Sequence, residues 1–203
     1  MSRGRFLVFE GIDACGKTTQ ARRVATALGA RFVFEPGDSD LGAELRRWLL
    51  DAATPMEAVT ESLLMLADRS HHVATVIEPA LAAGTTVVAD RFAASTIAYQ
   101  GYGRGLDLAL VQAATDLAIG ACRADLTVLL DIAPDVADER RRRDRQDRFE
   151  SADPDFHERV RAGYRALAAA DPDRWVVLDG SGDLDAVGAA VDAVLAAGGW
   201  WRA

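Results

Sequence analysis

The chain has 203 residues, of which 50% are hydrophobic and 27% are charged, and its formal net charge at pH 7 is −8. This composition is ordinary for a soluble globular protein and excludes a disordered or collagen-like chain, and the length predicts one domain over residues 1–203. The acidic balance argues against nucleic acid as a partner, because nucleic-acid binders neutralise phosphates with basic surfaces. The apolar runs are too short for a membrane span of about 20 residues or for a signal peptide, so we expect a cytoplasmic protein.

Segments typical of strands and helices alternate along the chain. Short apolar runs predict strands at residues 5–10, 31–34, 85–89, 126–131 and 175–178. Amphipathic patterns predict helices at 18–28, 41–50, 55–83, 95–100, 107–120, after Pro134, at 153–170 and at 183–197. The alternation predicts an α/β fold with a five-stranded parallel sheet flanked by helices. Such sheets bind ligands at the carboxyl ends of their strands. Four of the five predicted strands lead there into a candidate binding element: the turn at Gly11, Glu35-Pro36-Gly37, Asp90-Arg91 and Asp131.

The turn after the first strand matches GxxxxGK[ST] at every fixed position, as Gly11-Ile12-Asp13-Ala14-Cys15-Gly16-Lys17-Thr18. Glycines let backbone N–H groups converge on a phosphate, and the following helix presents its positive end to the same anion. Lys17 is expected to reach the β- and γ-phosphates and Thr18 to bind Mg²⁺. Chance matches to this pattern occur, but Lys17 is the only lysine among 23 basic residues. Because a planar guanidinium does not replace a compact ammonium in a phosphate cradle, this lone lysine favours nucleotide binding.

A second polar cluster follows the third predicted strand. Ser95 and Tyr99 are four residues apart, as are Thr96 and Gln100, so a helix places them on one face beside Asp90-Arg91. Taken alone, this segment also fits a capped helix with an Asp–Arg ion pair.

Together these segments resemble the bacterial thymidylate kinases, over residues 5–180. The shared motifs, in that family's order, are the strand with Phe9-Glu10-Gly11, the loop to Thr18, Glu35-Pro36-Gly37, Leu64 to Arg69, Asp90 to Gly101, Gly103-Arg104-Gly105, Leu129 to Asp131, and Asp147 to Glu150. The resemblance implies a three-layer P-loop kinase fold with a short arginine-rich lid. It also implies transfer of the γ-phosphoryl group of Mg·ATP to dTMP, giving dTDP and ADP in dTTP synthesis, by a homodimer packed through its helices.

The resemblance also implies roles for individual residues. Arg69 and Arg91 would hold the acceptor phosphate, and Tyr99 would sit under the deoxyribose and exclude a 2′-hydroxyl. Asp13 and Asp90 would lie beside the Mg²⁺ that Thr18 binds, and Asp13, Lys17 and Arg91 would act in catalysis. ATP would contact Gly11, Ile12, Asp13, Ala14, Cys15, Gly16, Lys17, Thr18 and Thr19. The thymine would face Ser95, Thr96 and Gln100, and the acceptor site would also include Glu35 and Met65.

An arginine-rich segment, residues 139–150, predicts a mobile lid over about 140–152 that delivers a positive charge to the transferred phosphoryl group. The loop has no basic residue before Lys17, and family members with such a loop take that arginine from the lid. The candidates are Arg143, Arg145 and Arg148. For Arg140 to Arg142, a solvated helix face is an equally good interpretation.

Two positions depart from the family pattern. Phe34 stands where the family commonly has an arginine that contacts the acceptor phosphate, and Met65 where it often has a phenylalanine that stacks on thymine. Loss of a charge-assisted contact costs about 1.5–3 kcal/mol unless Arg69 and Arg91 suffice. These departures leave open another nucleoside-monophosphate kinase with a shifted acceptor. A nucleotide-operated switch without transferase activity is the alternative of a different class, and it would not need the two arginines and the second cluster together.

Three remaining residues receive simpler interpretations. Cys15 is expected to fill space, although a thiol at a helix N-terminus can be acidified and oxidised. His71 and His72 are expected to be ordinary helix residues.

Overall fold

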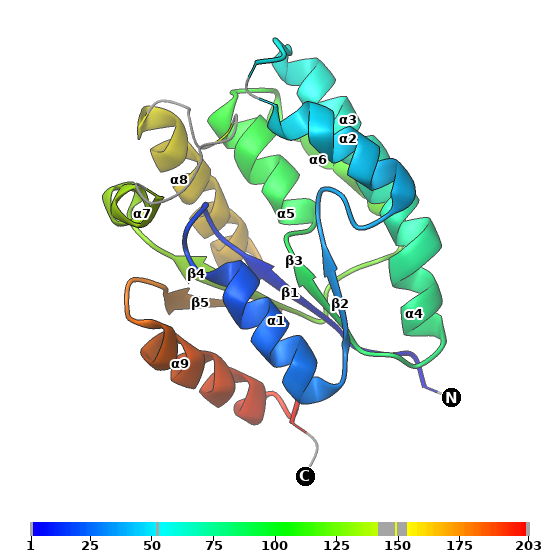
Figure 1. Cartoon of the computed structure of the whole chain (residues 1–203), viewed down its shortest axis with the longest axis vertical. Coiled ribbons are helices and arrows are strands. Elements are labelled where there is room, and N and C mark those ends of the chain that lie inside the picture. Colours follow the sequence, from blue (N-terminus) through cyan, green and yellow to red (C-terminus); the bar gives the residue numbers. More distant parts are fainter. Residues whose placement is uncertain (1, 52, 142–148, 150–153, 202–203) are drawn as a thin grey trace.

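The computed structural model describes residues 2–51, 53–141, 149 and 154–201 (Figure 1). Its strands are β1 (Phe6–Glu10), β2 (Arg31–Phe34), β3 (Val87–Asp90), β4 (Leu126–Asp131) and β5 (Trp175–Asp179). They form one parallel sheet in the order β2-β3-β1-β4-β5, which confirms the predicted architecture.

The central strand β1 pairs with β3 on one side and with β4 on the other. All five residues of β1 are buried, because helices cover both faces of the sheet, and its sequence is therefore a continuous apolar run up to Glu10. The edge strands β2 and β5 remain partly exposed. Alternate residues of β1 enter different core clusters, Phe6 and Val8 on one side and Leu7 and Phe9 on the other.

The helices are α1 (Lys17–Leu28), α2 (Asp40–Leu50), α3 (Ala58–His72), α4 (Glu78–Ala82), α5 (Ala93–Thr96), α6 (Leu108–Ile119), α7 (Pro134–Arg141), α8 (Pro154–Ala170) and α9 (Leu184–Ala197). Residues of α1, α8 and α9 belong to the core cluster with Leu7 and Phe9, and residues of α4 and the end of α6 to the cluster with Phe6 and Val8. Within the described ranges, no helix has the length and apolar character needed to cross a membrane.

Two π-helical segments extend predicted helices. The helix expected over 55–83 consists of α3, the π-helix η1 (Val73–Ile77) and α4, and it begins only at Ala58. The helix expected over 95–100 begins at Ala93 and continues as the π-helix η2 (Ile97–Gly103). At its end, a Cβ atom on Gly103 would lie 2.6 Å from the ring of Phe156, so glycine permits close packing of α8 against η2.

The sheet topology brings distant segments to one edge. Asp90 at the end of β3 lies beside Phe9 of β1 and beside Phe34 of β2. The turn after β1, the segment after β2 and the start of α5 after β3 therefore meet above the carboxyl ends of three neighbouring strands (Figure 1).

Candidate functional site

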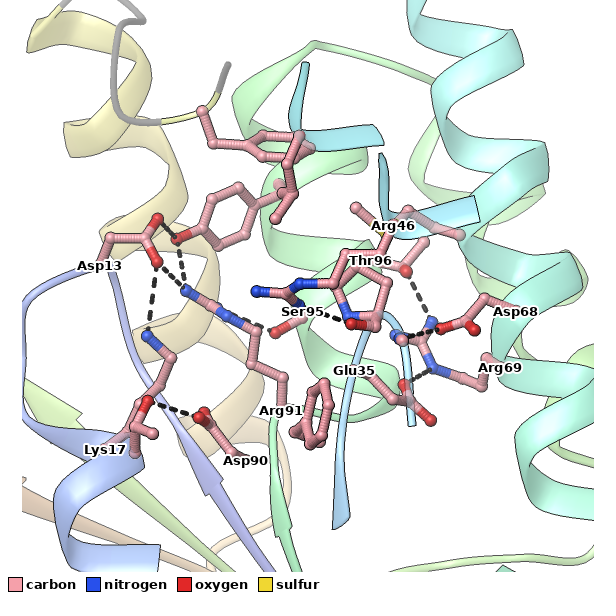
Figure 2. Close-up of a pocket in the computed structure, with 18 of the residues that line it drawn as sticks. Asp13, Lys17, Glu35, Arg46, Asp68, Arg69, Asp90, Arg91, Ser95 and Thr96 are labelled. Carbon is pink, nitrogen blue, oxygen red and sulfur yellow. Dashed lines mark hydrogen bonds and ion pairs between the residues drawn. The ribbon is translucent and has the colours of Figure 1, made fainter. Parts of the chain in front are cut away.

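A cavity of about 580 Å³ lies at this edge of the sheet (Figure 2). The turn after β1, the segment from β2 into α2, the helix α3, the end of β3, and η2 all contribute side chains to its wall. The predicted site residues that line it are Asp13, Lys17, Thr18, Glu35, Met65, Arg69, Asp90, Arg91, Ser95, Thr96, Tyr99 and Gln100. The fold thus brings together residues from across the first half of the chain.

The loop over residues 11–18 has the backbone geometry of an anion cradle. Gly11 has a φ of +144°, and a Cβ atom there would lie 2.6 Å from the carbonyl oxygen of Leu130, so only glycine fits. The N-terminus of α1 carries no side-chain cap and no acidic residue in its first turn, so its positive end is available to an anion. The Nζ atom of Lys17 folds back over this loop, 3.3 Å from the carbonyl oxygen of Ile12.

Arg91 lines the cavity and contacts the loop directly. Its φ of +72° lies in the left-handed region, which is rare for a bulky residue and often found at functional sites. Its guanidinium forms an ion pair with Asp13 and donates to the carbonyl oxygen of Gly11 at 3.1 Å and to the hydroxyl of Tyr99 at 3.0 Å. Tyr99 in turn donates to Asp13 at 2.8 Å.

This network controls the charge of Asp13. Burial alone would raise the pKa of Asp13, but the positive charges of Arg91 and Lys17 outweigh burial and hold that pKa below its usual range. Burial raises the pKa of Tyr99 well above its usual value, so the phenol remains a hydrogen-bond donor. Asp13 is therefore a permanent carboxylate next to two cations.

Glu10 of β1 and Tyr164 of α8 hold the residues of this network in place through buried hydrogen bonds. The buried carboxylate of Glu10 accepts hydrogen bonds from the backbone N–H of Phe92 at 2.9 Å, from Ser95 at 2.7 Å and from Tyr164 at 3.0 Å. Burial raises the pKa of Glu10 despite the nearby Arg91. Arg91 also donates to Tyr164 at 3.0 Å, so α8 takes part in positioning it.

Glu35 organises the opposite end of the cavity. The Nε atom of Arg69 donates to Glu35 at 2.7 Å, and Nη1 donates to the hydroxyl of Thr96 at 2.6 Å. The Nδ1 atom of His72 lies 2.9 Å from the other Glu35 oxygen, and its Nε2 atom lies 3.4 Å from Asp38. Burial would raise the pKa of Glu35, but Arg69 and His72 outweigh it and lower that pKa. Burial by itself would lower the pKa of His72, but the hydrogen bond and charge of Glu35 raise it.

Asp68 adds a second carboxylate to this end. One oxygen accepts from the backbone N–H of Gly37 at 3.2 Å, and the other is buried with no hydrogen-bond partner among the described residues. Burial and the negative charge of Glu35 raise the pKa of Asp68 to about 6. Asp68 therefore titrates near neutral pH.

The residues present suit a magnesium ion that is also bound by a nucleotide. The hydroxyl of Thr18 donates to one oxygen of Asp90, and the other oxygen of Asp90 is buried without a hydrogen-bond partner in the described part of the chain. Hydroxyl and carboxylate oxygens are the ligands that Mg²⁺ prefers, usually from one or two carboxylates together with substrate phosphates and water. The described residues contain no group of three or more His, Cys, Asp or Glu side chains that could hold a metal without such phosphates.

Comparison with known proteins identifies the family. The family model for thymidylate kinase matches residues 9–191. The chain belongs to the thymidylate kinase family. It is 45% identical over 205 residues to the thymidylate kinase of Geobacter sulfurreducens, with 95% of this chain and 96% of the relative covered. It is 47% identical to that of Solidesulfovibrio magneticus, with 92% and 96% covered.

A solved structure agrees with this assignment. The crystal structure of thymidylate kinase from Ehrlichia chaffeensis superposes with a TM-score of 0.78 at 32% identity, over 95% of this chain and 98% of that one. The resemblance read from the motifs and the P-loop kinase fold are both confirmed.

Within this thymidylate kinase fold, the two predicted phosphate-binding arginines lie apart. Figure 2 shows the guanidinium of Arg91 on the side of Asp13 and Lys17, and Arg69 on the side of Glu35 and Asp68. Because Arg69 donates to Thr96, a residue expected to face the base, its position fits the base end better than the phosphate end.

Arg46 of α2 lies near the position where the family commonly has another arginine. The ring of Phe34 lines the cavity, and the guanidinium carbon of Arg46 is 5.6 Å from the centre of that ring. The Nη1 atom of Arg46 donates to the carbonyl oxygen of Pro36 at 2.5 Å. A guanidinium from a different element thus reaches the region that Phe34 leaves without a charge.

The remaining predictions have mixed outcomes. Of the residues expected to contact ATP, Asp13, Lys17 and Thr18 line the cavity, and Gly11, Ile12, Ala14, Cys15, Gly16 and the exposed Thr19 do not. Arg143, Arg145 and Arg148 lie outside the described residues. Arg140 is anchored rather than solvated, since it donates to the carbonyl oxygens of Ala14, Gly180, Ser181 and Gly182.

Cys15 fits the space-filling interpretation. Its thiol is buried under Gly11, and burial raises its pKa, which disfavours the reactive thiolate that the helix N-terminus suggested.

Several functional side chains were missed by sequence reasoning. Glu10 carried a signal, because a charged residue ending a fully apolar strand must find buried partners. The reading of His72 as an ordinary helix residue was wrong, since it is fully buried and contacts Glu35. Tyr164 carried no local signal, because its partners lie more than 65 residues away.

Proposed function

We propose that this protein transfers the γ-phosphoryl group of Mg·ATP to dTMP, giving dTDP and ADP, as a step in dTTP synthesis. One observation carries the proposal: a single cavity joins Asp13, Lys17 and Thr18 of the phosphate loop to a polar pocket in which Arg69, Thr96 and Gln100 can bind a base.

The donor end is formed by the loop and the start of α1. ATP would contact Gly11, Ile12, Asp13, Ala14, Cys15, Gly16, Lys17 and Thr18, with its phosphates on backbone N–H groups at the helix N-terminus. Lys17 would neutralise the phosphates that Arg91 approaches from the other side. Thr18, Asp13 and Asp90 would hold Mg²⁺, which when bound neutralises phosphate charge and orients the γ-phosphoryl group.

The acceptor end extends from Arg91 to Gln100. Arg91, helped by Arg46, would hold the dTMP phosphate, while Arg69 with Ser95, Thr96 and Gln100 would face the thymine. Met65 lines the same wall and can cover a ring face with its polarisable thioether. Tyr99, held by Asp13 and Arg91, would lie under the deoxyribose, and Glu35 would position Arg69.

The reaction needs positioning and positive charge rather than a protein base. The acceptor oxygen belongs to a phosphate and is already anionic, so no proton has to be removed from it. Lys17 and Arg91 would stabilise the negative charge that spreads over the transferred group. One of Arg143, Arg145 and Arg148 would supply a further charge from a lid.

We further propose that the protein is a homodimer. Large apolar side chains are exposed on α3 and on the two helices that contact it, with Trp48 on α2, Leu63 on α3, and Leu110 and Leu117 on α6. Exposed apolar surface of this kind favours burial against a second copy. Sedimentation at micromolar concentration tests this proposal, and a monomer would contradict it.

The activity is tested by measuring ADP formation from Mg·ATP with dTMP, dUMP, dCMP, dGMP, UMP and thymidine in parallel. Selective turnover of dTMP is expected. A preference for another monophosphate would show that dTMP is not the acceptor. Binding of nucleotides without acceptor-dependent formation of ADP would contradict the transferase proposal.

A further inference from the structure

Gln100, which lines the base end of the cavity, is held from behind by a buried glutamate. The side-chain Nε2 atom of Gln100 donates to Glu61 at 3.1 Å. Glu61 comes from α3, is 1% exposed and does not line the cavity. The base-facing amide therefore has a partner outside the substrate site.

Arg104 ensures that Glu61 accepts this hydrogen bond and that Gln100 donates it. Its Nε atom donates to one Glu61 oxygen at 3.1 Å and its Nη2 atom to the other at 2.9 Å. A carboxylate bound in this bidentate way accepts hydrogen bonds and has no proton to donate. If the Gln100 amide turned over, its carbonyl oxygen would face a buried carboxylate, and two acceptors in contact are unfavourable.

The fixed amide has a consequence for the cavity. Because the NH₂ group of Gln100 faces Glu61, its carbonyl oxygen is turned the other way, and Gln100 lines the cavity. Gln100 thus presents its carbonyl oxygen, a hydrogen-bond acceptor, to the cavity. An amide without a fixed partner could instead turn and present its NH₂ group.

We propose that Glu61 is a specificity-determining positioning residue, which makes Gln100 present its carbonyl oxygen to the N3–H group of the acceptor base. Thymine and uracil carry a proton on N3, whereas cytosine has an unprotonated N3 acceptor next to an amino group. The fixed carbonyl accepts from the first two and meets an acceptor in the third, a mismatch of the kind that sites reject strongly. This inference rests on the proposed function, because it takes a pyrimidine monophosphate as the acceptor.

The substitution Glu61→Gln tests the proposal. In either orientation the new amide sets its NH₂ group against a donor of Arg104, so it no longer enforces one arrangement of Gln100. When the NH₂ group replaces the oxygen that accepts from both Gln100 and the Nε atom of Arg104, Gln100 must present its own NH₂ group to the cavity. We expect the ratio of kcat/KM for dTMP to that for dCMP to fall at least tenfold. The ratio for dTMP to dUMP should stay constant, since both bases carry N3–H, and the KM for ATP should not change.

A matched control separates specificity from stability. Glu57→Gln makes the same change at the N-terminal end of α3, where the side chain is exposed, and should leave both ratios unchanged. A merely structural Glu61 would lower the activity with dTMP and dCMP by the same factor. That result in Glu61→Gln would overturn the proposal.

A double-mutant cycle tests whether Glu61 acts through Gln100. In a Gln100→Leu background, which has no amide to orient, Glu61→Gln should no longer change the dTMP to dCMP ratio. An equal change in both backgrounds would overturn the inference.

Calorimetric binding keeps this test independent of the proposed reaction. If the wild-type protein forms no ADP with dTMP, the transferase proposal fails, and binding of dTMP and dCMP then decides the role of Glu61. A wild-type preference for dTMP that Glu61→Gln removes would support the inference, and a wild-type protein without that preference would overturn it.

Discussion

The guanidinium of Arg91 forms an ion pair with the carboxylate of Asp13 and so joins the end of β3 to the phosphate loop. The two residues are 78 positions apart in the chain, and both line the cavity. The pair places one positive charge between the donor end and the acceptor end of the site.

We expect Arg91→Ala to lower kcat/KM for dTMP by about 10³-fold or more, because it removes a charge that the transition state requires. The substitution also leaves Asp13 less compensated, so thermal unfolding must be measured in parallel. Arg91→Lys retains the positive charge but lacks the planar guanidinium group with its several donors. It should therefore recover part of the lost kcat/KM. An Arg91→Ala protein that is folded and has wild-type kcat/KM would contradict the assignment.

The substitution Lys17→Arg tests the requirement for an ammonium in the loop. Lys17 is buried against the loop, and a larger planar group cannot take its place without displacing the backbone. We expect kcat to fall about 10²-fold or more, as for the loss of a charge-stabilising donor. Arg47→Lys, an opposite exchange at an exposed position of α2, is the control and should have no effect. Retention of full activity in Lys17→Arg would refute the steric argument.

The raised pKa of Asp68 predicts a specific pH dependence of stability. A carboxyl group whose pKa is higher in the folded than in the unfolded state stabilises the fold at low pH, and this contribution is lost as pH rises through the folded pKa of about 6. Relative to Asp68→Asn, which cannot ionise, the wild-type protein should lose about 2 kcal/mol between pH 4 and pH 6.5. Urea titrations of both proteins across this range measure the difference, and a constant difference would show that Asp68 is not perturbed.

The pKa of His72 is also raised, so its contribution should likewise disappear as pH rises through its folded value, above 6.5. The variant His72→Gln keeps a hydrogen-bond donor for Glu35 but cannot titrate. We expect its stability to be independent of pH at this site, so that the wild-type protein loses stability relative to it as the pH rises above 6.5. The same urea titrations, extended to pH 9, test this expectation.

Arg46 is expected to compensate for Phe34. If Arg46 binds the acceptor phosphate, Arg46→Ala should raise the KM for dTMP by about 10-fold or more, in line with the loss of a charge-assisted hydrogen bond. The second variant, Phe34→Arg, should restore affinity in the Arg46→Ala background. An unchanged KM for dTMP in Arg46→Ala would show that Arg91 binds the acceptor phosphate without Arg46 and would contradict the compensation.

Gly103→Ala tests the contact between η2 and α8. Its added Cβ atom would lie 2.6 Å from Phe156 and 2.8 Å from Val160, so we expect a loss of about 1–3 kcal/mol in the free energy of unfolding. At Gly182 the same substitution meets no atom closer than 3.5 Å, and it serves as the control. Equal stability of the two variants would show that α8 can move away from η2.

Much of the fold and the phosphate loop could be read from contiguous residues. Strands β1 and β4 are buried on both faces of the sheet, so each appears in the sequence as an apolar run. The loop over 11–18 binds through its own backbone and the helix that follows it, so every part of its chemistry lies within one short segment. The second cluster is local as well. Its members line the cavity from one helical segment, where a spacing of four residues places side chains on one face: Ser95, Thr96, Tyr99 and Gln100.

The partners of these residues were decided by the tertiary structure. Glu35 pairs with Arg69 from 34 positions away, Gln100 with Glu61 from 39, and Glu10 with Tyr164 from 154. Neither the helical spacing of three or four residues nor the alternation of a strand connects residues so far apart in the chain. They exist because a buried charge or amide must be satisfied, and the packing of helices on the sheet determines which polar group is near enough to satisfy it.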